Sequence, residues 1–150
     1  MPDLTKIKPE PYERYFLYNA NGIELRIQKV GDRYEFERKT ELSSLAREEL
    51  KFAITQGEFN ALKKYSQKAL FRENYLLSKN PEISLKIYQG DYQRLVRVEV
   101  EFKSEQKAQA FKPLTWFGAE ITGTPLGRDK TLIALSKNQF TNLLKKFSLA

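Results

Sequence analysis

The sequence contains no cysteine and no histidine among its 150 residues. Without cysteine the chain forms no disulfide and no thiolate metal site, and without histidine only oxygen atoms remain as metal ligands. A bound metal would therefore be magnesium, manganese or calcium. Long apolar runs and a secretion signal are also missing, so we expect a soluble, cytoplasmic protein with no membrane partner.

Acidic residues are fewer than basic ones, with 19 Asp and Glu against 26 Lys and Arg, which gives a net charge of +7. This balance favours an anionic partner such as a phosphate, a nucleotide, nucleic acid or acidic lipid, and it does not choose among them. A chain of this length can bury a core without disulfides or metals. We expect one domain over residues 1–150, with residues 1–11, rich in proline, as an irregular N-terminal arm.

Alternation of charged and apolar side chains is clearest at residues 94–102 (RLVRVEVEF). On a strand, Arg97, Glu99 and Glu101 would point to one face and the valines to the other. Two glutamates two positions apart repel each other unless a cation, a basic side chain or a metal lies between them. Glu99 and Glu101 are therefore the most informative chemical feature of the sequence.

The same alternation predicts further strands at residues 12–18, 23–30, 33–40, 71–77, 83–89, 116–122 and 131–135. Helical spacing and capping residues predict helices at roughly Phe59 to Leu70, Ser104 to Phe111 and Asn138 to Phe147. Residues 45–54 are ambiguous, because Arg, Glu, Leu and Lys favour helices. As a strand, this segment would place Arg47, Glu49 and Lys51 on one face.

Strands with one charged and one apolar face, joined by short turns and few helices, predict an α+β fold. We expect an antiparallel β-barrel or a strongly curved sheet with flanking helices. The charged face could meet solvent, as it does in most sheets. It could also line the lumen of a closed barrel, where opposite charges balance and basic side chains bind an anion. Composition does not decide between the two.

Taken together, these segments resemble the CYTH superfamily, the triphosphate tunnel metalloenzymes. The best part is VEVEF-KSEQKAQAF-KP-TWFGAEIT, which is similar to the family's Glu-x-Glu-Phe strand, Ser-Glu helix and Trp-x-Gly-x-Glu-Val-Thr segment. ELRIQKVGDRYEFERK, AREELKFAI and LFRENYL are similar to three other strands of the family, in the same order. The similarity runs from about Tyr12 to Ala134.

The resemblance implies an eight-stranded antiparallel tunnel, whose basic residues hold a triphosphate and whose acidic residues hold a divalent metal, magnesium or manganese. It also makes the ambiguous residues 45–54 a strand. The basic residues matched in this way, or facing the same side, are Arg26, Lys39, Arg47, Arg72, Lys86 and Arg97. The acidic residues are Glu49, Glu99 and Glu101.

The sequence departs from the family where catalysis would be affected. The family's Glu-x-Glu-x-Lys signature is not reproduced, Gln28 and Asn74 replace arginines, and Lys86 stands where an acidic metal ligand is usual. An ammonium at position 86 would lie near Glu99 and Glu101 and would supply part of the charge of a metal. Alternatively, Lys86 merely pairs with one neighbouring glutamate, or a shifted strand turns it towards solvent.

Three functions remain open. The main hypothesis is a divergent tunnel protein that binds a phosphorylated small molecule or polyphosphate, with catalysis weak or lost, because phosphoryl transfer depends on metal neutralisation. The alternative is an active metal-dependent triphosphatase acting on tripolyphosphate or on nucleoside or thiamine triphosphate. A nucleic-acid or partner-binding module ranks below both, since lysine pairs such as Lys63-Lys64 are typical of solvated helix faces. No catalytic residue, natural ligand or oligomeric state follows from the sequence.

Overall fold

The computed structural model describes residues 1–42 and 47–148. These residues form two compact units, one of residues 11–71 and the other of residues 1–10 with 72–150. Seven antiparallel strands, numbered β1 to β7 along the chain, form the sheet, and β4 and β7 end its strand order, so it is not closed into a barrel among these residues. This agrees with the antiparallel, curved-sheet alternative of the sequence-based prediction. No helix in the described part of the chain is long and apolar enough to span a membrane.

The first unit is built on consecutive hairpins. Its strands are β1 (Glu10–Ala20), β2 (Ile23–Val30), β3 (Arg33–Glu41) and β4 (Arg47–Ala53), followed by helix α1 (Gln56–Lys63). The order in the sheet is β4-β3-β2-β1, and β5 (Lys68–Lys79) follows next to β1. The β1–β2 turn uses Asn21 and Gly22 with φ of 53° and 72°, a backbone conformation that Asn and Gly tolerate and tight hairpins require.

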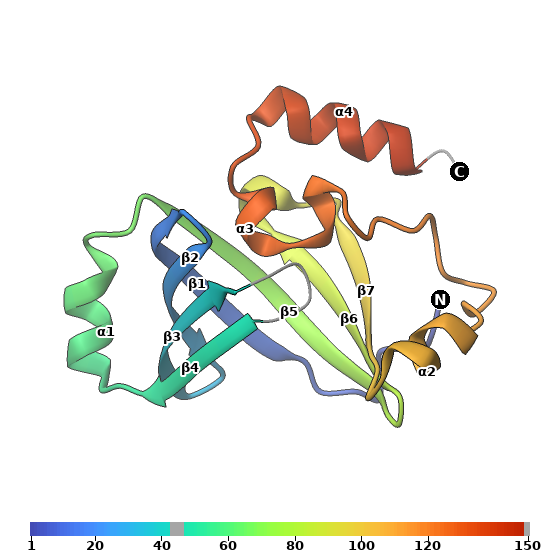
Figure 1. Ribbon diagram of the computed structural model, residues 1–150, viewed down its shortest axis with the longest axis horizontal. Coiled ribbons are helices and arrows are strands. Elements are labelled where there is room, and N and C mark those ends of the chain that lie inside the picture. Colours follow the sequence, from blue (N-terminus) through green and yellow to red (C-terminus); the bar gives the residue numbers. More distant parts are fainter. Residues whose placement is uncertain (43–46, 149–150) are drawn as a thin grey trace. The chain divides into compact units, whose positions relative to one another are not determined.

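Helix α1 covers the apolar face of this unit (Figure 1). Thr55 and Glu58 form a capping box, which fixes the start of the helix by satisfying backbone N–H groups of its first turn. Phe59 is buried and packs edge to face on Tyr15, with ring centroids 5.6 Å apart. Ile27 is completely buried in the same cluster. The opposite face of the strands carries charged side chains.

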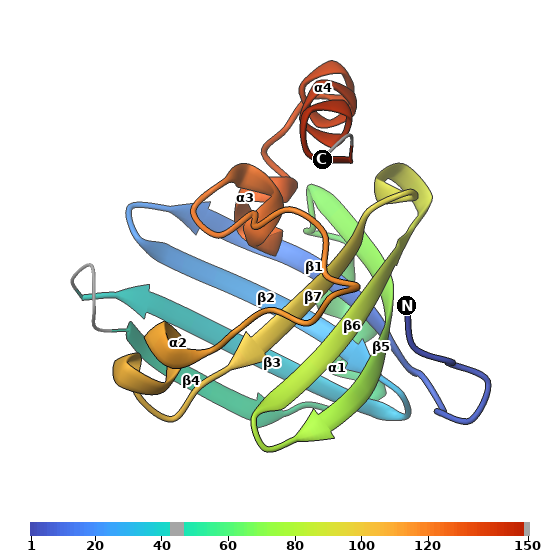
Figure 2. The ribbon, with the colours of Figure 1, turned by 90° about the vertical axis from the view of Figure 1, so that its right-hand side faces the viewer.

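The second unit contains the rest of β5, then β6 (Glu82–Gln89) and β7 (Val96–Glu101). Figure 2 shows β6 between β5 and β7, in agreement with the strand order. The remaining elements are η1 (Gly90–Tyr92), α2 (Glu105–Ala110), η2 (Pro125–Gly127), α3 (Asp129–Leu132) and α4 (Lys137–Ser148). Buried apolar side chains from these elements include Leu85, Leu126, Leu132, Phe140 and Leu144.

Most predicted strands are confirmed, and residues 47–53 form a strand as the resemblance implied; Leu45 and Ala46 lie outside the described residues. The helices at Ser104 and Asn138 are confirmed within a few residues. The helix predicted for Phe59 to Leu70 begins earlier and ends at Lys63, because residues 68–70 already belong to β5. Similarly, the N-terminal arm ends at Pro9, since β1 begins at Glu10.

Two predicted strands are wrong. Residues 116–122 form no strand, because the chain turns at Leu114–Phe117, where Phe117 N donates to Leu114 O at 2.9 Å. Residues 131–135 end the short helix α3 and the turn after it. A short apolar run does not by itself distinguish a buried strand from a buried helical turn, which is why the sequence pattern misled here.

The core of residues 11–71 can be tested at Ile27, whose side chain is completely buried. We expect Ile27→Ala to lower the free energy of unfolding by about 2–5 kcal/mol, because it removes buried atoms and leaves a cavity. Leu76→Ala is the control, since Leu76 is 46% exposed. Urea titration followed by circular dichroism measures both, and equal losses would contradict the assigned core.

Candidate functional site

In residues 11–71, charged side chains of opposite sign face each other across the strands. Arg26 lies opposite Glu37 and Glu24 lies opposite Lys39 in the β2–β3 register. One strand further, Lys39 lies opposite Glu49. Side chains directly opposite on one face of an antiparallel pair are close enough to interact. On the charged face predicted from the sequence, basic and acidic side chains therefore alternate from one strand to the next.

The contacts on this face centre on Arg26, which is buried. Its guanidinium lies 2.6 Å from Glu24 and 3.0 Å from Glu37. Lys39 Nζ lies 3.6 Å from Glu37 and 3.9 Å from Glu49. We call these five residues the Arg26 cluster.

Next to the Arg26 cluster, a side-chain hydrogen-bond chain connects three strands. Buried Arg14 donates to Gln28 Oε1 from Nε and Nη2, at 3.0 and 2.8 Å. Gln28 Nε2 in turn donates to Glu35 Oε2 at 2.7 Å. The amide of Gln28, at a position where the resemblance implies an arginine, thus links an arginine of β1 to a carboxylate of β3.

The two carboxyl groups of Glu37 and Glu49 titrate differently. Burial opposes ionisation of Glu37, but Arg26, a hydrogen bond with Glu49 and the ammonium of Lys39 together lower its pKa to about 2. The same carboxyl–carboxyl hydrogen bond, with burial, raises the pKa of Glu49. Glu37 is therefore the permanent anion that holds Arg26, while Glu49 is the carboxyl that can carry a proton.

In residues 72–150, a second set of charged side chains comes from four elements. Arg72 lies on β5, Lys86 on β6, Arg97 and Glu99 on β7, and Asp129 at the start of α3. Lys86 lies opposite Arg97 in the β6–β7 register. The three basic side chains and Asp129 are all buried, whereas the Glu99 side chain is 39% exposed. We call these five residues the Arg97 cluster.

Asp129 is the carboxylate at the centre of the Arg97 cluster. Its Oδ1 accepts hydrogen bonds from Arg97 Nη2 at 2.8 Å and from the hydroxyl of Tyr88 at 2.7 Å. Its Oδ2 lies 3.5 Å from Arg72 Nη2. Arg97 Nη1 also donates to the backbone carbonyl of Leu126 at 3.2 Å. These contacts fix both guanidinium groups and fasten the start of α3 to the sheet of this unit.

Lys86 forms an ion pair and a hydrogen bond with Glu99. Burial and the neighbouring Arg72 lower the pKa of Lys86 to about 8, and Arg97 acts in the same direction against the effect of Glu99. Glu99 also lies 3.8 Å from Arg97. Although burial opposes it, the ammonium of Lys86 holds the pKa of Glu99 below its usual value. Two arginines, Arg72 and Arg97, thus lie near the Lys86–Glu99 pair.

The comparisons with known proteins agree with this arrangement. No family model matches the sequence. An inorganic triphosphatase of Nitrosomonas europaea is 32% identical over 121 residues, which cover 79% of this chain and 80% of that protein. Such identity over most of both chains indicates common descent. The chain belongs to the CYTH, or triphosphate tunnel metalloenzyme, superfamily.

Solved structures support the same assignment. The crystal structure of the inorganic triphosphatase NE1496 superimposes with a TM-score of 0.69 and 29% identity, covering 91% of this chain and 92% of that one. A second crystal structure, of the hypothetical protein NE1496, gives a TM-score of 0.67 with 29% identity and covers 88% and 89% of the two chains. The CYTH-like fold expected from the sequence is therefore confirmed.

The CYTH resemblance implied three acidic metal ligands, of which Glu49 lies in residues 11–71 and Glu99 and Glu101 lie in residues 72–150. Among the described residues, no group of three or more acidic side chains could hold a metal ion. Glu99 is paired with Lys86, and Glu49 shares a hydrogen bond with Glu37. Glu101 is exposed at the end of β7, opposite Glu82. The carboxylates of Glu49 and Glu99 therefore already have partners within their own units.

The sequence-predicted residues fall into three groups in this CYTH protein. Arg26, Lys39 and Glu49 come together in one unit, and Arg72, Lys86, Arg97 and Glu99 come together in the other. Arg47 and Glu101 are exposed at strand ends and belong to neither cluster. The sequence analysis did not propose as site residues three members of the clusters and two residues that hydrogen-bond beside them, which are Glu24, Glu37, Asp129, Arg14 and Tyr88. All except Asp129 lie on predicted strands, so the alternation could have found them.

The role of Asp129 can be tested by removing its charge while keeping its shape. We expect Asp129→Asn to lower the free energy of unfolding by about 3–5 kcal/mol, because the substitution leaves buried guanidinium groups with an uncompensated charge. Asp91→Asn is the matched control, since Asp91 is exposed. Guanidinium chloride titrations measure both variants, and a loss at Asp129 no larger than the control's would contradict the role of the buried ion pairs.

Proposed function

We propose that this CYTH protein binds a triphosphate-type anion, with the basic side chains of the Arg97 cluster as its ligands. The observation that carries the proposal is the grouping of three buried basic side chains, Arg72, Lys86 and Arg97, in this cluster. Buried cations held at fixed positions form charge-assisted hydrogen bonds with phosphate oxygens. The excess of positive charge on the whole chain, +7, favours the approach of such an anion.

Hydrolysis of the anion is slow or absent in this proposal. Catalysis of phosphoryl transfer depends on neutralising charge that develops on the transferred group, and metal ions usually do this by bridging phosphate oxygens. In this protein the carboxylate of Glu99 is instead ion-paired with Lys86, which carries a single positive charge. An ammonium balances part of the negative charge but offers no coordination site for water or phosphate.

An active triphosphatase is the second candidate. The relative from Nitrosomonas europaea, 32% identical to this chain, is named an inorganic triphosphatase, and the solved structure of NE1496 carries the same name. In that case Glu49, Glu99 and Glu101 would act with magnesium or manganese. Both candidates share the same substrate class, a polyphosphate, so binding and turnover have to be measured separately.

A hydrolysis panel separates the two candidates. Tripolyphosphate, ATP and thiamine triphosphate are incubated with the protein, with and without magnesium or manganese, and released phosphate is measured. We expect calorimetric binding of tripolyphosphate without metal and little phosphate release under any condition. Metal-dependent release at about 1–100 turnovers per second, the usual enzyme range, would reject the slow-hydrolysis proposal and establish the triphosphatase.

Anion binding also has a pH signature at Lys86. A bound polyphosphate stabilises the ammonium form, so binding above pH 8 takes up a proton and the affinity falls as the pH rises through the pKa of about 8. Lys86→Arg keeps the charge at every accessible pH and should remove the decline. Calorimetry in two buffers of different ionisation enthalpy measures the proton uptake. Lys137→Arg is the control, since Lys137 is exposed on α4, and an unchanged decline in Lys86→Arg would contradict the assignment.

A further inference from the structure

Strand β4 has a free edge and alternates charged with apolar side chains. Within the described sheet it ends the strand order, next to β3. Every residue of β4 is exposed, including Leu50 at 54% and Phe52 at 47%. An exposed edge strand is a template for pairing with another strand unless something covers or blocks it.

The hydrogen-bonding pattern shows which backbone groups face outwards. Ile54 N donates to Tyr34 O at 2.9 Å, which makes this a hydrogen-bonded pair of the β3–β4 ladder. Such pairs alternate with pairs whose N–H and C=O groups point away from the partner strand. In the β3–β4 register, Lys51 faces Glu37 and Glu49 faces Lys39 in pairs of the second kind. Glu49 and Lys51 therefore direct their backbone groups to the open edge.

The side chains at this edge are complementary to a second copy of themselves. We propose that β4 is the interface of a two-fold homodimer, in which β4 pairs antiparallel with β4 of a second copy. With Leu50 opposite Leu50, each Glu49 lies opposite Lys51 of the second copy, and both residues present the backbone groups that the pairing needs. The two nearest registers that use the same backbone groups place Glu49 opposite Glu49 or Lys51 opposite Lys51, and like charges there repel.

The pairing extends the charge alternation of the sheet across the two-fold axis. Within one copy the row runs from Glu24 through Lys39 to Glu49. It continues in the second copy through Lys51 and Glu37 to Arg26, so six neighbouring side chains alternate in sign. A foreign strand would match this row only by chance, whereas a second copy matches it by symmetry.

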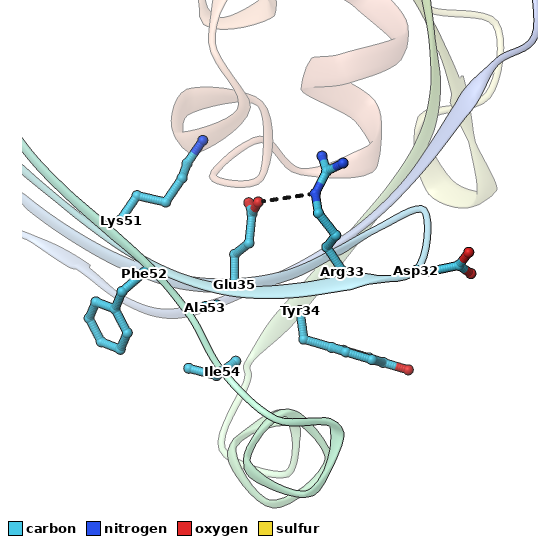
Figure 3. Close-up of a pocket in the computed structure, with 8 residues that line it drawn as sticks. All are labelled: Asp32, Arg33, Tyr34, Glu35, Lys51, Phe52, Ala53 and Ile54. Atoms are coloured by element: carbon cyan, nitrogen blue, oxygen red, sulfur yellow. Dashed lines mark ion pairs between the residues drawn. The ribbon is translucent and has the colours of Figure 1, made fainter.

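A hollow of about 430 Å³ at the end of β4 has room for a side chain of the second copy. Its lining includes Glu35 and Ala53, which lie opposite each other, and Figure 3 shows Glu35 and Lys51 on one side of the sheet with Phe52 on the other. In the dimer, Arg47 of the second copy lies opposite Ala53. Its guanidinium enters the side of the sheet that carries Glu35, next to a small side chain.

Charge reversal tests this register. We expect the wild-type protein to form a dimer that dissociates on dilution in sedimentation velocity, because one pair of strands buries little area. Glu49→Lys or Lys51→Glu alone places like charges opposite each other twice and should weaken the dimer about tenfold or more. An equimolar mixture of the two variants should restore a dimer, since the two lysines at positions 49 and 51 of one copy then face the two glutamates at positions 51 and 49 of the other.

Lys64→Glu is the matched control for Lys51→Glu, because it makes the same charge change at an exposed position outside β4. Hydrogen exchange provides a second readout: the amides of Glu49 and Lys51 should become protected as the protein concentration rises. Circular dichroism of each variant excludes misfolding as the cause of dissociation. A wild-type protein that stays monomeric up to about 1 mM, or a mixture of variants that fails to dimerise, overturns the proposal.

Discussion

Asp129 carries its charge into the interior of residues 72–150, where Arg97, Arg72 and the hydroxyl of Tyr88 surround it. A carboxylate in such a place costs several kcal/mol of desolvation, which only close opposite charges and hydrogen bonds offset. The two arginines have the same requirement. Each group therefore makes the burial of the others possible, and the positions of Arg72 and Arg97 are set by this mutual dependence.

The same principle organises residues 11–71 with different residues. Arg26 is held between Glu24 and Glu37, and Lys39 lies between Glu37 and Glu49. Because Glu37 stays ionised down to a pKa of about 2, this unit keeps its central negative charge across the physiological range. In both units the basic side chains are thus held in place by carboxylates of the same unit.

Local pattern predicted the parts of the structure that depend on local geometry. The period of two in β2, β3 and β7 identified the charged faces. The alternative in which a shifted strand turns Lys86 towards solvent is wrong, since Lys86 is buried and contacts Glu99. The role of Asp129 could not be predicted from local pattern, since its partners Arg97 and Tyr88 lie 32 and 41 residues away from it in the chain. Nothing periodic marks its segment, and the apolar run after it favoured a strand that does not form.

Gly127 shows how closely the backbone before Asp129 is packed. A Cβ atom at this position would lie 2.7 Å from the carbonyl oxygen of Ile121, a distance that a side chain cannot adopt. That same oxygen accepts hydrogen bonds from the backbone and the hydroxyl of Thr124, at 3.0 and 2.7 Å, so it has little freedom to retreat. Any side chain at position 127 would therefore displace the backbone just before Asp129. The position of the buried Asp129 carboxylate thus depends on an uncharged glycine two residues earlier in the chain.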